Sequence, residues 1–353
     1  MTNRREFILG AGAVVAGAGA VTARGATEPD PKLCEAGRMI VKPGTLPITG
    51  TFLDEISYDI PHQNWGVKEW DADFGHMKAI GIDTVVMIRC GLRKFIACPS
   101  KQLLGRGCYM PSTDLAAMFL RLAEKSGMSF YFGLYDPGIE DTKDENPWLR
   151  NYTKANLPLI DELWRTYGSC PAFKGWYLSS EFSTEFLESS VDTVRQLGRR
   201  CKDVSGGLPV LISPYIIGRK CALVKRMKHV PTLDEHKANW NAIFDAVHDV
   251  LDICAFQDGF VDYSEVAEYA AVNRELCKKY GIRCWTNTES FDRDMPIRFP
   301  PIKFDKLRLK LEGAAQGGCE KAITFEFSHF MSPQSMYPSA AGLYNRYREY
   351  MGV

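Results

Sequence analysis

Two glutamates of this chain each follow a short apolar segment that reads as a buried strand. Glu181 ends the segment GWYLSSE at residues 175–181, and Glu289 ends the segment WTNTE at residues 285–289. Two carboxyl groups can work together, one as a general acid and one as a base or nucleophile, when their surroundings push their pKa values apart. The alternative for each glutamate is a solvated carboxylate or a structural ion pair.

The elements that would position these glutamates alternate regularly along the chain. Eight apolar runs are expected strands, at residues 48–53, 84–89, 129–135, 175–180, 209–214, 253–257, 282–288 and 322–328. The amphipathic segments that follow them are expected helices, at residues 71–80, 114–126, 151–167, 190–201, 233–250, 263–280, 303–316 and 340–351. Asp114 stands at the start of one helix, and Gly81, Gly127 and Gly281 stand just past the ends of three others, as helix-terminal residues often do.

This alternation predicts repeated βα units and a parallel sheet. After a connector at residues 27–46, eight consecutive units predict an α/β fold, a single-domain (β/α)8 TIM barrel at residues 47–353. A doubly wound open sheet could use the same alternation. However, no Gly-rich phosphate-binding sequence follows the first strand, which favours the barrel.

Active sites of such barrels lie at the C-terminal ends of the strands and in the loops that follow. Aromatic rings placed there can cover the C–H faces of a sugar while polar side chains bind its hydroxyl groups. The candidate substrate-binding residues are Arg89, Trp65, Trp70, Tyr135, Ser180, Tyr215, Gln257, Asp258, Trp285, Asn287, Glu326 and His329. Three of them have a structural alternative. Trp285 could fill the core, Glu326 could be the buried partner of a cation, and His329 could simply cap the strand.

The two glutamate motifs resemble those of retaining glycoside hydrolases on (β/α)8 barrels, which carry an acid/base glutamate on strand four and a nucleophile glutamate on strand seven. The residues of the two motifs are also similar to those of a family of exported barrel proteins regarded as glycosidases. The resemblance implies that Glu181 is the acid/base, that Glu289 is the nucleophile and that Arg89 is a donor to Glu289. Ser180 stands where the clan commonly has Asn, so no substrate follows from the resemblance. It implies double displacement on an oligo- or polysaccharide, without a cofactor.

Two other classes of function stay open at this point. One is a barrel that binds glycans without catalysis. The other is a metal-dependent or acid/base barrel hydrolase or isomerase that uses Asp54, Glu55, Asp136, Asp258 and His329. The sequence has no HxH or HExxH spacing and no Cys/His cluster at zinc spacing, so it predicts no metal site.

The first 26 residues resemble a twin-arginine export signal. Arg4 and Arg5 precede an uncharged run of Gly, Ala and Val from Gly10 to Val21, and small residues follow around Ala23 to Ala26. The alternative is a transmembrane anchor, but the run is shorter than the roughly 20 residues that span a bilayer. The mature protein is therefore expected in the periplasm or outside the cell, without stable membrane insertion.

The net charge indicates which partners are expected, and the positions of the cysteines indicate how these residues pack. Lys plus Arg and Asp plus Glu each number 43, so the formal net charge is zero and no excess of positive charge attracts nucleic acid. Carbohydrate is the expected partner. The 11 cysteines are scattered, many of them within apolar runs, and are expected to pack as small apolar side chains.

Overall fold

The computed structural model describes residues 44, 46–57, 60–138, 147–184, 187–224 and 229–353. The predicted export signal at residues 1–26 and most of the predicted connector at residues 27–46 lie outside the described residues.

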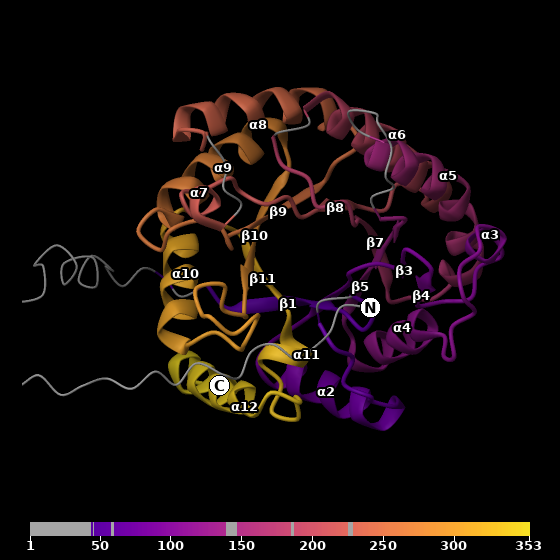
Figure 1. Cartoon of the computed structure of the whole chain (residues 1–353), viewed down its shortest axis with the longest axis horizontal. Coiled ribbons are helices and arrows are strands. Elements are labelled where there is room, and N and C mark those ends of the chain that lie inside the picture. The colour runs from indigo at the N-terminus through magenta and orange to yellow at the C-terminus, as the bar shows by residue number, and fades with distance from the viewer. Residues whose placement is uncertain (1–43, 45, 58–59, 139–146, 185–186, 225–228) are drawn as a thin grey trace, which may run out of the picture. The chain divides into compact units, whose positions relative to one another are not determined.

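Eight parallel strands form a closed ring (Figure 1). They are β1 (Ile48–Leu53), β2 (Thr84–Met87), β5 (Ser129–Gly133), β7 (Phe173–Leu178), β8 (Val210–Ile212), β9 (Ile253–Gln257), β10 (Arg283–Glu289) and β11 (Lys321–Phe325). Around the ring the order is β1-β11-β10-β9-β8-β7-β5-β2, so the pairing of β1 with β11 closes it. The predicted (β/α)8 barrel is confirmed.

Eight long helices surround the ring (Figure 1). They are α2 (Val67–Ala79), α4 (Leu115–Ser126), α5 (Pro147–Tyr167), α6 (Leu187–Ser205), α8 (Leu233–Val247), α9 (Val266–Tyr280), α10 (Phe304–Gln316) and α12 (Pro338–Met351). Asp114 caps α4 by accepting a hydrogen bond from the N–H of Ala117 at 2.9 Å. Gly127 and Gly281 end α4 and α9 in the left-handed conformation, as the sequence predicted.

Several short elements in the loops were not predicted. They are β3 (Gly91–Leu92), β4 (Phe95–Ile96), β6 (Tyr135–Asp136), α3 (Lys101–Gly105), α7 (Lys220–Val224) and α11 (Phe327–Phe330). β3 pairs with β4 in antiparallel fashion and with β6 in parallel fashion, which makes a second, three-stranded sheet. Two-residue strands carry too little periodicity to be recognised in a sequence, and the first residue of β6 belongs to the strand predicted at residues 129–135.

The apolar core has two shells, as in a barrel whose interior is packed with side chains. The inner shell fills the ring and consists of Phe52, Val86, Ile88, Tyr131, Tyr177, Leu211, Ile253, Ala255, Trp285 and Ile323. The outer shell lies between strands and helices and includes the fully buried Trp176 and Trp240. The described cysteines are all unbridged and most of them are buried, which agrees with their expected role as apolar side chains.

Candidate active site

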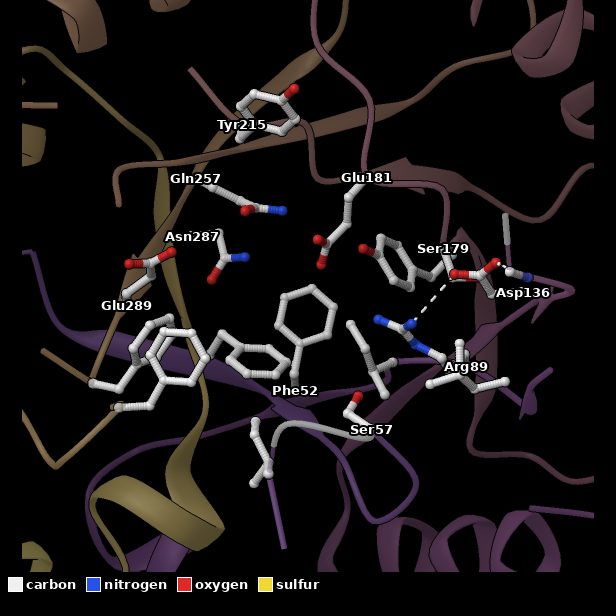
Figure 2. Close-up of a pocket in the computed structure, with 18 of the residues that line it drawn as sticks. Phe52, Ser57, Arg89, Asp136, Ser179, Glu181, Tyr215, Gln257, Asn287 and Glu289 are labelled. Carbon is white, nitrogen blue, oxygen red and sulfur yellow. Dashed lines mark hydrogen bonds and ion pairs between the residues drawn. The ribbon is translucent and has the colours of Figure 1, made fainter. Parts of the chain in front are cut away.

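A cavity of about 560 Å³ lies at the C-terminal ends of the barrel strands (Figure 2). Its charged and polar lining includes Ser57, Arg89, Arg93, Asp136, Ser179, Glu181, Gln257, Asn287, Glu289 and Arg293. Its aromatic lining is formed by Phe52, Trp148, Tyr177, Tyr215, Phe260, Phe291, Phe299 and Phe325. A concave site with a few polar groups set into an apolar wall is the usual form of a small-molecule site.

Glu181 follows β7 by three residues and projects into this cavity (Figure 2). Among the described residues, no hydrogen bond or ion pair engages its carboxyl group. The side chain is exposed to the solvent of the cavity, but protein atoms surround it closely, and the resulting partial desolvation raises its pKa above the ordinary glutamate value. The positive charges of Arg89 and Arg293 oppose the shift, while the negative charges of Asp136 and Glu289 add to it. Glu181 therefore keeps its proton to a higher pH than a solvated glutamate.

Glu289 is the last residue of β10 and is almost completely buried. Arg293 binds its carboxylate in a forked arrangement. The Nε atom of Arg293 donates to Oε1 at 3.0 Å and to Oε2 at 2.8 Å, and Nη2 donates to Oε1 at 2.6 Å. A guanidinium group bound in this way stabilises the ionised carboxylate. The two glutamates thus line one cavity in opposite environments.

Arg293 is itself held by aromatic rings. Its guanidinium carbon lies 4.6 Å from the ring centroid of Phe260, 4.8 Å from that of Phe291 and 5.5 Å from that of Phe299. On the other side of the pair, Gly259 is in close contact with the Glu289 carboxylate. A Cβ atom at this position would lie 2.2 Å from Oε1, so the close approach requires glycine.

A buried ion pair supports the end of β10 from behind. Lys310 of α10 lies 2.8 Å from Asp258, and each side chain is only 4% exposed. Asp258 also accepts a hydrogen bond from the N–H of Glu289 at 3.2 Å, and Lys310 donates to the carbonyl of Glu289 at 3.4 Å. Asp258 does not line the cavity. Its expected substrate contact is therefore corrected to a structural role beside Glu289.

Arg89 lines the cavity, but its expected contact with Glu289 is wrong. Its Nη1 atom lies 3.3 Å from Oδ2 of Asp136, which follows β5, the strand paired with β2. Figure 2 shows Arg89 and Asp136 on one side of Glu181 and Glu289 on the other. Arg293 provides the cation beside Glu289 that the resemblance assigns to Arg89.

Three more predicted residues line the cavity, namely Tyr215, Gln257 and Asn287. The amide of Gln257 donates to the carbonyl of Ser213 at 2.7 Å, and the amide of Asn287 donates to its hydroxyl at 2.9 Å. Ser213 thereby fixes both amide groups before any ligand binds. Their contact with a substrate stays a prediction.

The two tryptophans of the first loop do not line the cavity. Trp70 is fully buried in α2 and its ring lies 4.7 Å from that of Phe119 in α4, while Trp65 packs on Trp70 at 5.1 Å. The expectation that Trp65 and Trp70 contact substrate is therefore corrected. The helix begins at Val67, earlier than the predicted residue 71, and so places Trp70 on its buried face.

Three residues predicted at strand ends also lie outside the cavity lining. Trp285 belongs to the inner shell of the barrel, so the core-filling alternative is correct for it. The hydroxyl of Tyr135 donates to the carbonyl of Arg93 at 2.7 Å and secures a loop. Ser180 is buried, and its neighbour Ser179 lines the cavity instead. Successive side chains of an extended chain point to opposite sides, which accounts for the exchange.

Glu326 and His329 form a buried structural pair rather than part of the cavity lining. The carboxylate of Glu326 accepts from the N–H groups of Ser328 and His329 and caps α11. Burial alone would lower the pKa of His329, but the adjacent Glu326 outweighs it and raises that pKa to about 9. The other ring nitrogen lies 3.0 Å from the carbonyl of Pro61. The expected substrate contacts of both residues are thus corrected to an ion pair that holds the loop before α2.

The residues expected for a metal-dependent or other acid/base enzyme do not form one group. Asp54, Glu55 and His329 lie close enough to influence one another's charge. Asp136 instead pairs with Arg89, and Asp258 pairs with Lys310. Of Asp54, Glu55, Asp136, Asp258 and His329, only Asp136 lines the cavity. Burial raises the pKa of Glu55 to about 7, with a neighbouring imidazolium opposing the shift. Within the described ranges, no group of three or more His, Cys, Asp or Glu side chains is arranged to hold a metal ion.

The sequence analysis does not predict Arg293 or most of the aromatic residues that line the cavity. Arg293, Phe291 and Phe299 belong to one loop after β10, and Phe260 belongs to the loop after β9. A spacing of four residues between Glu289 and Arg293 signals a contact only within a helix. No pattern in the sequence could therefore have identified the pair.

Residues 48–337 match the family described as a domain of unknown function, DUF4434. No curated protein matches the sequence. A crystal structure from Bacteroides thetaiotaomicron VPI-5482, described as that of a proposed alpha-L-fucosidase, is 56% identical with a TM-score of 0.84. The similarity covers 89% of this chain and 98% of that chain.

Two more distant structures share the fold. The endo-beta-1,4-mannanase from Thermotoga petrophila is 12% identical with a TM-score of 0.52, over 87% of this chain and 77% of that chain. The beta-galactosidase from the haloarchaeon Halorubrum lacusprofundi is 14% identical with a TM-score of 0.52, over 82% of this chain and 54% of that chain. At these identities the similarity concerns the barrel alone.

The fork between Arg293 and Glu289 can be tested through stability. Arg293→Gln leaves the buried Glu289 carboxylate without its cation, so we expect the free energy of unfolding in urea to fall by about 2 to 3 kcal/mol. Adding Glu289→Gln should restore part of this loss, because it removes the unpaired charge.

Arg199→Gln is the matched control, since Arg199 pairs with Asp249 on the surface, with side chains 59% and 47% exposed. It should cost less than about 1 kcal/mol. If Arg293→Gln is as stable as the parent protein, the fork contributes nothing to holding the Glu289 carboxylate.

Proposed function

Since the chain belongs to the family described as a domain of unknown function, DUF4434, and two carboxyl groups face one cavity, we propose that it is a glycoside hydrolase. The observation that carries the proposal is the unequal environment of these groups. Glu181 has a raised pKa and no described partner, whereas Glu289 is bound by Arg293. Cleavage of a glycosidic bond needs one protonated and one ionised carboxyl group.

In the first step, Glu181 gives its proton to the glycosidic oxygen while the bond from that oxygen to the anomeric carbon breaks. A carboxylate oxygen of Glu289 bonds to the anomeric carbon, and the leaving group departs as an alcohol. Phe260 and Phe291 hold the guanidinium of Arg293 in place, so the Glu289 carboxylate is oriented before the substrate binds.

In the second step, water attacks the anomeric carbon and Glu289 leaves as a carboxylate. Glu181, now ionised, takes a proton from this water and returns to its starting state. The charge of Arg89 stabilises Glu181 in its ionised form during this interval. Two displacements at the same carbon give net retention of configuration.

For the substrate, alpha-L-fucosides are the first to test, because the relative with 56% identity is described as a proposed alpha-L-fucosidase. Aryl glycosides of other sugars in both anomeric forms complete the panel. We propose that the natural substrate is an oligo- or polysaccharide. A barrel that binds glycans without catalysis would retain these ligands and hydrolyse none of the panel.

The two glutamates should differ in how their loss affects activity. Glu289→Ala removes the nucleophile and should lower kcat/KM by roughly a thousandfold or more on every substrate. Glu181→Ala should cost roughly 10²- to 10⁴-fold on substrates with poor leaving groups, and much less on activated aryl glycosides, which need little protonation. Azide should restore the activity of Glu181→Ala on an activated substrate. The product should be a glycosyl azide of retained configuration, identified by NMR.

Glu349→Ala is the control, since Glu349 is exposed on α12, and it should behave as the parent enzyme. Near-normal turnover by both Glu181→Ala and Glu289→Ala would refute the assignment. A glycosyl product of inverted configuration from the parent enzyme would refute the retaining mechanism while leaving the hydrolase in place.

The pH dependence should report Glu181. If Glu181 must be protonated, kcat/KM falls as pH rises through its pKa in the free enzyme, which lies above the ordinary 4.5. Arg89→Met removes a positive charge that lowers this pKa, so the alkaline limb should move to higher pH. Asp136→Asn removes a negative charge that raises it, so the limb should move to lower pH.

The opposite signs of these two shifts are the decisive feature. Shifts of the same sign in both variants, or none in either, would show that another group governs the alkaline limb.

We also propose that residues 1–26 direct export through the twin-arginine route, which would place the enzyme in the periplasm or outside the cell. Arg4→Lys with Arg5→Lys should leave the protein in the cytoplasm, with the leader uncleaved, as measured by fractionation and mass spectrometry. Lys68→Arg, an exposed basic position of α2, serves as a control for substitution alone. Normal export of the double variant would refute this route.

A further inference from the structure

Three large apolar side chains are exposed together on the loop after β2. Phe95 is 62% exposed, Tyr109 is 57% exposed and Met110 is 63% exposed. The rings of Phe95 and Tyr109 are in edge contact, with centroids 5.6 Å apart and an interplanar angle of 69°. We refer to Phe95, Tyr109 and Met110 as the rim platform. Single exposed apolar residues are common, whereas a group of them marks a binding surface.

The rim platform is fixed to the wall of the cavity. Phe95 belongs to β4, whose partner strand β3 contains Leu92, and Leu92 and Arg93 both line the cavity. Arg93 adopts a positive φ of 56° in the tight turn between β3 and β4. The N–H of Arg93 donates to the carbonyl of Asp136 at 2.7 Å, which ties this turn to β6.

The second half of the rim platform is anchored to the same turn. The N–H of Tyr109 donates to the carbonyl of Lys94 at 2.7 Å. The carbonyl of Arg93 accepts from the hydroxyl of Tyr135 at 2.7 Å and from the thiol of Cys108 at 3.4 Å. These contacts hold the platform in one position relative to the wall that carries Leu92 and Arg93. Leu92 and Phe95 are register partners, so their side chains lie on the same face of the hairpin, and Leu92 lines the cavity.

The chemistry of the rim platform fits a sugar ring. Aromatic rings pack on the apolar C–H face of a pyranose, and the exposed cationic side chains of Arg93 and Lys94 and the Tyr109 hydroxyl can bind the hydroxyl groups at its edge. We propose that the rim platform is a second sugar subsite, which binds the next ring of a glycan whose scissile sugar lies between Glu181 and Glu289. This inference rests on the proposed function and assigns to it a substrate of at least two sugars.

The test compares a short and a long substrate of the same terminal sugar. Phe95→Ala and Tyr109→Ala should each lower kcat/KM on oligosaccharides by roughly three- to tenfold, the effect of one lost aromatic contact. They should leave hydrolysis of the glycosyl fluoride of the same sugar unchanged, because fluoride provides no second ring for the platform to bind. Phe95→Trp keeps a flat face and should retain most of the activity on oligosaccharides. Met336→Ala removes another exposed apolar side chain, 50% exposed, and should change neither activity.

Equal losses on both kinds of substrate, or no loss on oligosaccharides, would overturn the subsite while leaving the hydrolase intact. If the parent protein hydrolyses no glycoside, the hydrolase fails by itself, and the subsite is then tested by binding to an array of mono-, di- and longer oligosaccharides. Stronger binding of the parent protein to longer glycans, lost in Phe95→Ala, supports the subsite. Equal binding of mono- and oligosaccharides, or no binding, overturns it.

Discussion

The pairing of β1 with β11 is the constraint on which the site depends, because it joins the two ends of the sheet into a ring. Thr51 of β1 lies opposite Thr324 of β11 and also accepts, through its hydroxyl, a hydrogen bond from the N–H of Phe327 at 2.9 Å. The last helix also holds the first strand, since the N–H of Ile48 donates to the hydroxyl of Tyr347 in α12 at 2.8 Å. An open sheet would spread its strand ends along one edge. The closed ring brings the ends of β7 and β10 to one cavity.

Within this cavity, the difference between the two carboxyl groups comes from what surrounds each of them. Glu181 is partly desolvated by the protein around the cavity and has no described partner, and its pKa rises. Glu289 has a forked guanidinium, a glycine at van der Waals contact and a backbone N–H fixed by Asp258. Burial penalises a charge unless a partner compensates it, so the surroundings disfavour the charge of the carboxyl group at one strand end and compensate it at the other.

Several charged residues near the strand ends serve the scaffold instead. Glu326 with His329 and Asp258 with Lys310 are buried ion pairs that fix loops at the rim of the ring. From the sequence alone such groups are candidates for catalysis, because ionisable residues near strand ends occur both in active sites and in structural ion pairs. They differ from Glu181 in that a partner compensates their charge. Each has a partner within hydrogen-bonding distance, whereas no described residue engages the Glu181 carboxyl group.

The sequence by itself determined the barrel, most element positions and the two strands that carry Glu181 and Glu289, because hydrophobic periodicity and helix-terminal residues are local signals. It also identified Arg89 as a cavity residue but not its partner, which depends on Asp136 in another βα unit. Only the tertiary structure decided that Arg293 binds Glu289, that Trp70 is buried and that Phe95 is exposed at the rim. These facts depend on how loops from different units pack, and contacts between segments distant in the chain leave no periodic trace in one sequence.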